Sequence, residues 1–324
     1  FRVNEISSAL FLINNNLSLI SDSGTVLKIL LLICLMEEDY NQAMVVIQAL
    51  TSDAELIGED PLALLLITGG IYKLGGLPDS FIDFRALDDS RYFADNAAYT
   101  WHIEKENKQH PTVLVACDKR DYFSHVLPLA YSLYETNRGI LDMHIHLYNS
   151  DDELKESVMA LGEQLPELHI SATLEQVPEG KHMAIQYAER RTIFIDYALR
   201  EFATPVISMN ADLLVRQPWV SPGGPLLLLE NENAPFWEAI FAGFIYAEPD
   251  SMTRGYFARV ARFIRSNLSA DTPVWCLDQV ALSASLDRLS GTEQMAISRA
   301  ARSAVVGDAD GRDVFCWPLS AAND

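Results

Sequence analysis

Basic residues are scarce in this sequence. Lysine and arginine together number 24 against 45 aspartates and glutamates, so the chain of 324 residues carries a formal charge of −21. Such a surface repels polyphosphates at long range, and we therefore expect neither nucleic-acid binding nor docking on an anionic membrane. An anionic small molecule would have to meet a locally basic pocket instead.

Cysteine is also rare. The four residues of this type, Cys34, Cys117, Cys276 and Cys316, lie far apart, and none forms a CxxC pair. This spacing argues against a disulfide framework and against a structural zinc motif, and it is typical of buried thiols in a reducing compartment. We therefore expect a cytoplasmic protein.

Long apolar runs and several common motifs are missing too. The densest apolar run, residues 26–36, contains Lys28 and is too short to span a bilayer, and Phe1 is not followed by the pattern of a secretory signal peptide. The absence of GxSxG, GxxxxGK[ST] and GxGxxG weighs against a hydrolase elbow, a P-loop and a dinucleotide site. Apolar residues still make up 49% of the chain, enough for a substantial core.

The first third of the chain has helical apolar spacing. The apolar quartet at residues 30–33 recurs at 64–67, 34 residues later, and each copy is followed by a second amphipathic segment, 39–50 and 78–87. A helix–turn–helix unit with this period resembles tetratricopeptide repeats. We expect an all-α, TPR-like helical domain over residues 1–105, with a plain antiparallel helical bundle as the alternative.

After a polar linker at 104–110 the pattern changes, and the second domain is expected over residues 106–324. Strands are predicted at 112–116, 143–148, 169–174 and 205–209, separated by helices at about 122–137, 152–165 and 182–202. This alternation is typical of βαβ units and predicts an α/β domain with a largely parallel sheet. Ligands of such sheets bind at the carboxyl ends of the strands, so the polar residues there are the candidates for function.

Two histidines alternate on one of these predicted strands. His144 and His146 share a face because successive side chains of a strand point in opposite directions. The strand itself gives them no carboxylate partner. We therefore expect core or surface histidines rather than a metal site.

Polar clusters follow the first and the fourth predicted strand. The first strand ends in Ala116-Cys117-Asp118, with Tyr122 close behind, and the fourth is followed by Asn210-Ala211-Asp212. An aspartate directly after a buried strand displays its carboxylate on a rigid backbone, which suits a hard cation that could bridge to a diphosphate. Alone, such an aspartate is more often a turn or helix-cap residue.

Three further sequence elements follow one another in an order that is informative about the family. Arg191 lies in the helix before the fourth strand, residues 241–246 read Phe-Ala-Gly-Phe-Ile-Tyr, and residues 277–282 read Leu-Asp-Gln-Val-Ala-Leu. With the two polar clusters, this order over residues 112–282 resembles the nucleotide-sugar-dependent glycosyltransferases of the GT-A fold, most of all family eight and its relatives. The resemblance implies a GT-A-like, Rossmann-like domain with a mostly parallel mixed sheet. It also implies transfer of a sugar from a nucleotide diphosphate sugar to a hydroxyl acceptor.

The resemblance implies roles for individual residues. Asp212 would hold Mn²⁺ or Mg²⁺ against the diphosphate, and Asp278 and Gln279 would face the transferred sugar as the catalytic pair. Gly243 lacks a Cβ atom, which would let the backbone approach the sugar closely. The nucleotide sugar would be bound by Ala116, Asp118, Tyr122, Arg191, Asn210, Ala211 and Gly243. Arg191, with Arg190, Lys119 and Arg120 as competitors, would supply the positive charge that the chain otherwise lacks.

Two departures from the family pattern support a second hypothesis. Asn210 stands where the family has the first aspartate of its DxD motif, and no histidine or lysine follows Gly307, where the family places a metal ligand and a phosphate-binding lysine. The alternative is therefore a catalytically degenerate GT-A domain that acts as a scaffold, with the helical repeats binding a protein partner.

Overall fold

The computed structural model describes residues 8, 24–52, 57, 60–88, 99–106, 109–180, 182–232, 234–268, 274–307 and 313–319. The chain divides into two compact units. The first comprises Phe1–Ala86 with Asn233–Trp237, and the second Leu87–Glu232 with Glu238–Asp324. The sequence places the boundary at residue 105 instead. The structure moves it toward the N-terminus because strand β1, Thr100–Ile103, pairs within the sheet of the second unit.

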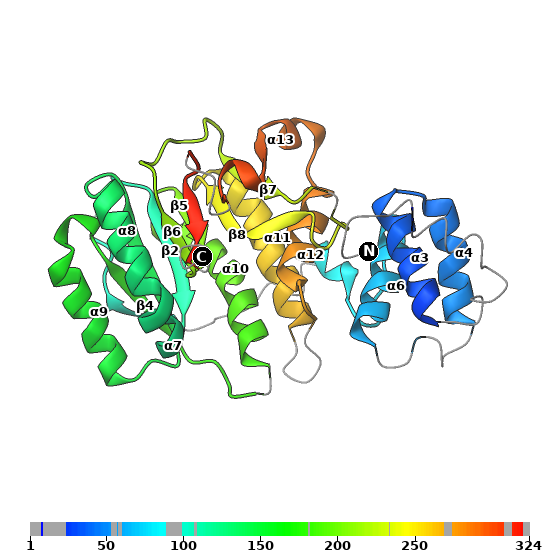
Figure 1. The fold of residues 1–324 in the computed structure, drawn as a ribbon, viewed down its shortest axis with the longest axis horizontal. Helices are drawn as coiled ribbons and strands as arrows, with labels where there is room; N and C mark the ends of the chain where they lie inside the picture. Colours follow the sequence, from blue (N-terminus) through cyan, green and yellow to red (C-terminus); the bar gives the residue numbers. More distant parts are fainter. Residues whose placement is uncertain are drawn as a thin grey trace. The chain divides into compact units, whose positions relative to one another are not determined.

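The first unit is helical, as the sequence predicts. Its long helices in the described residues are α3, α4 and α6, which span Gly24–Met36, Tyr40–Thr51 and Pro61–Lys73 (Figure 1). The Asp39 side chain accepts a hydrogen bond from the Gln42 amide at the start of α4, and Asp60 caps α6 in the same way, which fixes where both helices begin. Helices α4 and α6 pack closely, because a Cβ atom on Gly70 would lie 2.7 Å from Cδ1 of Ile47.

The helix predicted at 78–87 is not formed, and that prediction was wrong. Only a 3₁₀ turn, η1, occurs there, at Phe84–Leu87. The Phe84 amide donates to the Pro78 carbonyl at 3.0 Å, and Asp83 accepts from the Arg85 amide at 3.0 Å. Such local bonds compete with helical hydrogen bonding. Because this second helix of the second copy is missing, the TPR-like identity of the unit stays a prediction.

The second unit contains an eight-stranded mixed sheet, which confirms the expected α/β class. The strand order is β1-β4-β3-β2-β5-β8-β7-β9. Strands β2, β3, β4 and β5 run parallel, and β5–β8 and β7–β8 are antiparallel pairs. The strands not yet bounded are β2 Thr112–Cys117, β3 Asp142–Tyr148, β4 Ser171–Glu175, β5 Val206–Met209, β7 Leu226–Glu230, β8 Ile240–Ala247 and β9 Ile297–Ala301. Each of the four strands predicted from the sequence is therefore confirmed.

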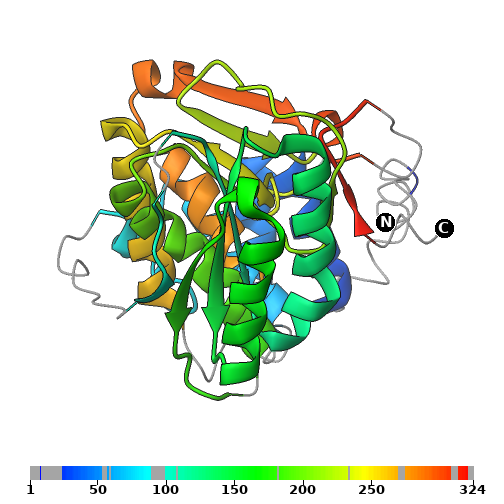
Figure 2. The same cartoon turned by 90° about the vertical axis from the view of Figure 1, so that its left-hand side faces the viewer.

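Helices cover both faces of this sheet (Figures 1 and 2). Val113 and Val115 of β2 point toward α8 and α9 and share a core with Leu129 of α8 and Val158 of α9. Helix α10 packs on the other side of β2 and β5, with α11 and α12 beside it. The helices of the unit are α7 Lys119–Asp121, η3 Tyr122–Val126, α8 Leu127–Asn137, α9 Asp152–Gln164, η4 Pro166–Leu168, α10 Met183–Glu201, α11 Ser251–Asn267, α12 Leu277–Leu286, α13 Gly291–Met295 and η5 Arg302–Ala304.

Two strands from distant parts of the sequence form a second, small sheet. Strand β6, Leu213–Val215, pairs antiparallel with β10, Cys316–Pro318. The Leu319 amide donates to the carbonyl of Asp212 at 2.6 Å. The residue directly before β6 is thus held by a segment from the other end of the domain.

A polar ladder lies buried between the sheet and α10. His144 and His146 are fully buried, and both bind the Thr173 hydroxyl, at 2.9 and 2.8 Å. His146 also contacts a Glu175 carboxylate oxygen at 3.0 Å, and Glu175 pairs with Arg190. Burial lowers the pKa of both histidines. The prediction of core histidines is confirmed, whereas the expectation that His146 lacks a carboxylate partner was wrong, because the partner comes from the neighbouring strand β4.

Two general expectations can be compared with the structure. All four cysteines are buried and unbridged. Within the described residues, no helix is long and apolar enough to cross a membrane.

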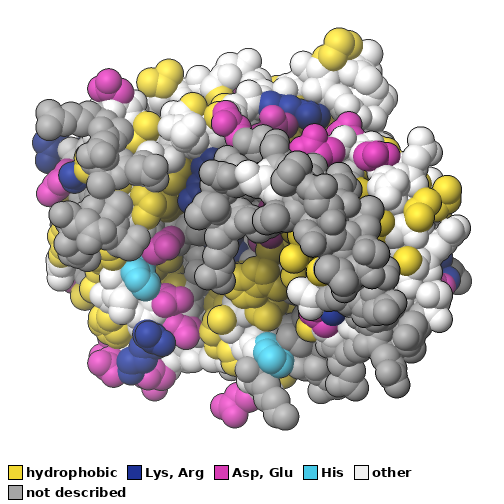
Figure 3. Space-filling model, turned by 45° about the vertical axis from the view of Figure 1, so that its right-hand side comes forward, with side chains coloured by type: hydrophobic (Ala, Val, Ile, Leu, Met, Phe, Trp, Pro, Cys, Tyr) yellow, Lys and Arg dark blue, Asp and Glu magenta, His cyan; other side chains and the backbone are white. Residues whose placement is uncertain are grey.

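On the face drawn in Figure 3, Asp and Glu side chains occur in several separate places rather than in one patch.

Candidate functional site

Two pockets of the second unit adjoin at the carboxyl ends of β2 and β5. These neighbouring strands are the point where the chain changes direction across the sheet, because β3 and β4 follow β2 on one side and β5 lies on the other. Open α/β sheets bind ligands at such a switch point. The strand-end pocket has a volume of about 250 Å³ and is lined by Ala116, Cys117, Asp121, His125, Ala184, Tyr187, Ala188, Arg191, Ala211 and Asp212.

The second pocket, called here the Gly243 pocket, has a volume of about 200 Å³. It is lined by Ile185, Ala188, Glu189, Arg191, Asn210, Phe241, Ala242, Gly243, Trp275, Cys276, Asp278 and Gln279. Ala188 and Arg191 of α10 belong to the walls of both pockets. The two pockets therefore adjoin, with Arg191 in the wall that they share.

Arg191 is held in place by the two strands it faces. Its side chain is almost fully buried, Nη1 donates to the amide oxygen of Asn210, and Nη2 donates to the Ala242 carbonyl at 3.0 Å. Its Nε has no hydrogen-bond partner among the described residues. A guanidinium has five N–H groups, so this cation keeps donors for a ligand after both anchoring bonds are made.

Asn210 and Gly243 face each other across the ends of β5 and β8. The Asn210 amide donates to the Gly243 carbonyl at 2.9 Å, which extends the antiparallel pairing by one residue. A Cβ atom on Gly243 would lie 2.9 Å from Nδ2 of Asn210 and 2.3 Å from the Phe241 ring. The absence of a side chain at Gly243 thus leaves room for the side-chain amide of Asn210, whose oxygen accepts the hydrogen bond from Arg191.

The predicted catalytic pair lies at the start of α12. Asp278 is 6% exposed, and burial raises its pKa while the nearby Arg191 lowers it. Cys276, directly before the helix, adopts a left-handed backbone with φ of 63°, a strained conformation for a residue other than glycine. Burial also raises the pKa of the Cys276 thiol to about 12, so this cysteine is not a thiolate nucleophile near neutral pH.

Glu189 is a site residue that the sequence did not point to. It is 2% exposed, and its Oε2 has no hydrogen-bond partner among the described residues. Burial raises its pKa well above the usual range, the negative charge of Asp278 adds to this, and backbone amides at the start of α12 act in the opposite direction. Oε2 of Glu189 and Nε of Arg191 are thus two buried polar atoms without a hydrogen-bond partner among the described residues, and both belong to side chains that line the Gly243 pocket.

Besides Arg191, the strand-end pocket contains three of the residues expected to bind the nucleotide sugar or its ion. Ala116 belongs to β2, and Ala211 and the exposed Asp212 follow β5. Tyr187, which the sequence gave no reason to select, stacks on Tyr148 with ring centroids 4.6 Å apart. A phenol ring fixed in this way offers its other face or its edge to a flat ligand.

Two of the expected ligand-binding residues line neither pocket. Asp118 accepts a hydrogen bond from the Asp121 amide at 2.9 Å and so caps the short helix α7. Tyr122 is fully buried, and its hydroxyl donates to the Ser157 carbonyl of α9 at 3.1 Å. The expectation that Tyr122 contacts a nucleoside was wrong, because the helical turn after β2 directs this ring into the core.

The structure also separates Arg191 from its competitors. Lys119 forms ion pairs with Asp151 at 2.7 Å and Glu153 at 2.5 Å on the surface of α9. Arg190 pairs with Glu175. Neither residue lines the two pockets, whereas Arg191 lines both.

The residues at the strand ends offer little to a metal ion on their own. Asn210 gives its amide oxygen to Arg191, which leaves Asp212 as the one carboxylate of the Asn-Ala-Asp segment. Mg²⁺ in nucleotide enzymes is commonly held by one or two carboxylates together with substrate phosphates and water. Asp212 therefore fits an ion that arrives with a diphosphate rather than one bound by the protein alone.

Comparisons with known proteins give a distant likeness. The chain matches no protein-family model, and the comparison with curated proteins gives no match. Among solved structures, it is similar to the apo structure of WbbM, a bifunctional glycosyltransferase, with a TM-score of 0.43 and 13% identity over 64% of this chain and 42% of that chain. It is also similar to the glycosyltransferase GlyE of Streptococcus pneumoniae TIGR4, with a TM-score of 0.37 and 15% identity over 59% and 45% of the two chains.

The aligned region spans less than half the length of either of these proteins. A likeness this distant carries no argument about activity.

Replacing Gly243 tests whether the packing around this residue leaves room for a side chain. We expect Gly243→Ala to displace Asn210 and Phe241, to cost about 1–3 kcal/mol through overpacking, and to weaken ligand binding through Arg191. The matched control is Gly255→Ala in α11, where a Cβ atom meets nothing within 4 Å and should stabilise the helix. Thermal unfolding of the two variants measures the difference. Equal stability of Gly243→Ala and the wild type would contradict the expected clash.

Proposed function

We propose that this chain is a glycosyltransferase that moves a sugar from a nucleotide diphosphate sugar to a hydroxyl acceptor. One observation carries the proposal: Arg191, a buried and anchored cation, lines two adjoining pockets at the switch point of an α/β sheet. A nucleotide sugar has the matching division into a nucleoside, a central diphosphate and a sugar.

The strand-end pocket would take the nucleotide. Its place at the carboxyl ends of β2 and β5 is the usual position for a nucleotide in an open α/β sheet. Arg191 would then meet the diphosphate, where its remaining N–H groups can bind phosphate oxygens. This single cation suits a protein with a net charge of −21, because the ligand needs one local positive charge rather than a basic surface.

The Gly243 pocket would take the sugar. Asp278 and Glu189 offer carboxyl oxygens to sugar hydroxyls, and Gln279 offers an amide. The exposed ring of Trp275 at this pocket presents a flat apolar surface to the sugar or its acceptor. This arrangement is the reason to place the reacting carbon in the Gly243 pocket.

The reaction would exchange one carbon–oxygen bond for another. The acceptor oxygen bonds to the anomeric carbon, the nucleoside diphosphate leaves with the electron pair of the broken bond, and the acceptor's proton passes to the departing phosphate oxygen. Asp278 would stabilise the positive charge that develops at the anomeric carbon, and Arg191 the negative charge on the leaving diphosphate. A divalent ion, if the diphosphate brings one, would be held by Asp212 and would neutralise the same leaving group.

Titration calorimetry with UDP-, GDP- and dTDP-sugars, with and without Mn²⁺, tests the proposal. We expect one class of nucleotide sugar to bind and to be hydrolysed slowly in the absence of an acceptor. Asp212→Ala should abolish any gain from Mn²⁺ and leave thermal stability unchanged, because this side chain is exposed. Absence of binding by every nucleotide sugar would overturn the proposal.

The scaffold hypothesis has one observation in its favour. Asn210 replaces a carboxylate, and its oxygen is occupied by Arg191, which reduces the ligands available to a metal ion. A scaffold would bind a nucleotide sugar or nothing, without hydrolysis or transfer. The hydrolysis assay therefore separates the two functions.

A further inference from the structure

Three potential metal ligands meet at the edge of the sheet opposite the two pockets. His110 precedes β2, Asp142 is the first residue of β3, and His169 lies just before β4. These three strands are parallel neighbours, so their amino ends lie at one edge and their carboxyl ends at the other. Any role for this group is therefore separate from the proposed sugar transfer.

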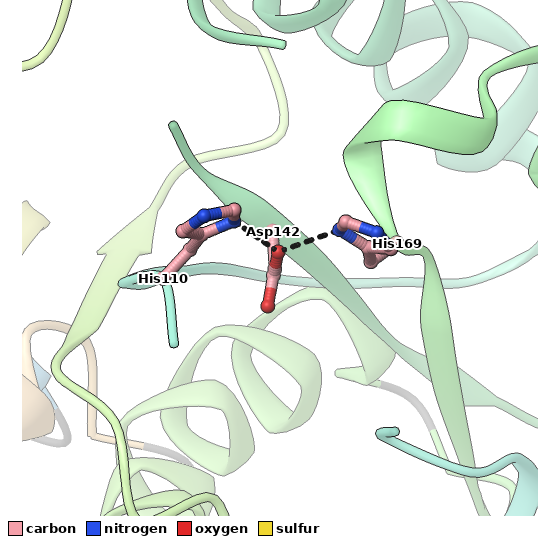
Figure 4. Close-up of side chains that lie close together, drawn as sticks. All are labelled: His110, Asp142 and His169. Carbon is pink, nitrogen blue, oxygen red and sulfur yellow. Dashed lines mark hydrogen bonds and ion pairs between the residues drawn. The ribbon is translucent and has the colours of Figure 1, made fainter. Parts of the chain in front are cut away.

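Both imidazoles point at the same carboxylate oxygen. Nδ1 of His110 lies 3.2 Å and Nδ1 of His169 lies 3.1 Å from Oδ1 of Asp142 (Figure 4). The three ligand atoms all lie within 4.8 Å of one another. Ligands about 2.0–2.1 Å from a tetrahedral zinc ion lie roughly 3.3 Å apart, so the observed spacing is close to that of a zinc site.

The surroundings of Asp142 fix its direction. Its side chain is 1% exposed, and its other oxygen, Oδ2, accepts from Lys105 at 2.8 Å. An outer partner of this kind orients a carboxylate ligand. His169 has a left-handed backbone with φ of 43°, and tertiary packing must hold a residue other than glycine in that conformation.

The two histidines leave a path for an ion. The His110 and His169 side chains are 26% and 45% exposed, in contrast to the buried carboxylate between them. Three protein ligands with a solvent-accessible side provide an open position for water. Two imidazoles and one carboxylate favour zinc or a similar transition metal over Mg²⁺ and Ca²⁺, which prefer oxygen ligands.

We propose that His110, Asp142 and His169 form a binding site for one divalent transition-metal ion of the zinc class. The ion would tie together the amino ends of three neighbouring strands and keep one position for water. Its role would be to stabilise the sheet edge opposite the substrate pockets. Among the described residues, this is the one group of three or more His, Cys, Asp or Glu side chains with suitable spacing.

The test uses the full chain and the metal alone. We expect one equivalent of Zn²⁺ to bind and to raise the melting temperature, and one equivalent of Co²⁺ to give the visible absorption of a tetrahedral site. His110→Ala and His169→Ala should each weaken Zn²⁺ binding by at least about tenfold. His182→Ala, which removes an exposed histidine outside this group, should leave binding unchanged.

Replacing Lys105 should change the affinity for Zn²⁺ in the opposite direction to the histidine variants. Lys105→Met removes a positive charge beside the ion, so Zn²⁺ affinity should rise, although loss of the ion pair with Asp142 lowers the stability of the metal-free protein. The proposal is overturned if the wild type shows no saturable Zn²⁺ binding, or if it binds Zn²⁺ no more tightly than the two histidine variants. In either case the group only neutralises a buried carboxylate. Should Lys105→Met fail to fold, the histidine variants decide alone.

Discussion

Replacing Arg191 with glutamine is expected to weaken binding of a nucleotide diphosphate sugar by at least about 100-fold. Each hydrogen bond between charged groups contributes roughly 1.5–3 kcal/mol, and Arg191 can make more than one to a diphosphate. The loss is large because, among the described residues, the lining of the two pockets contains no second arginine or lysine. Arg191→Lys keeps the charge without the planar fork and should lie between the glutamine variant and the wild type.

The controls for this variant separate lost charge from lost structure. Arg191 also holds Asn210 and the Ala242 carbonyl, so a drop in melting temperature is expected beside the drop in affinity. Affinity for the unphosphorylated nucleoside should change little, because it carries no diphosphate. Arg200→Gln on the same helix removes an ion pair between the exposed Arg200 and the buried Asp196, and it should leave binding intact. Unchanged affinity of a folded Arg191→Gln protein would remove Arg191 from the proposed site.

Replacing Glu189 with glutamine is expected to stabilise the protein while preserving ligand binding. The folded-state pKa of Glu189 lies well above 4.5, its ordinary value, so the folded protein binds this proton more tightly than the unfolded chain. The wild type therefore loses stability as the pH rises from about 4.5 through the folded-state pKa. Glutamine has no proton to lose, so the gain in melting temperature should grow with pH over that range.

Ligand affinity of the Glu189 variants shows whether this carboxyl group contacts the ligand. A protonated Glu189 can both donate to and accept from a sugar hydroxyl, as glutamine can. We expect wild-type affinity to fall as this group ionises and affinity of the glutamine variant to stay level. In Glu189→Leu the sugar hydroxyl has no hydrogen-bond partner at this position, so the variant should bind the ligand about 10- to 100-fold more weakly than the wild type. If Glu189→Leu binds as well as Glu189→Gln, this residue does not contact the ligand.

The alternation of strands and helices in the second unit was predictable because the signals are local. Strands β2 and β5 are short apolar runs between polar turns, β3 alternates apolar and polar residues, and the helix at 182–202 has its own apolar spacing. The rule that ligands bind at strand ends then selected the region around Asp212. Arg191, Asn210, Gly243 and Asp278 were selected by the resemblance to a family, and the structure brings these four residues to one pocket.

The residues that the sequence did not reveal depend on contacts between distant elements. Glu189 is important because α10 packs near the start of α12, and no local pattern encodes that packing. The partner of His146 depends on β4 being the neighbour of β3. Two predictions were wrong for local reasons instead. The helical turn after β2 directs Tyr122 into the core. In the segment at 78–87, a side-chain hydrogen bond of Asp83 competes with the helix that the apolar spacing predicts.

The short pairing of β6 with β10 has a practical consequence for anyone who shortens or extends this protein. The backbone of Asp212 is fastened by Leu319, a few residues from the end of the sequence. A version that stops before Cys316 would lose this fastening and free the segment that follows β5. An affinity tag joined soon after Leu319 would likewise lie close in sequence to the strand that holds Asp212, so a tag is better placed elsewhere.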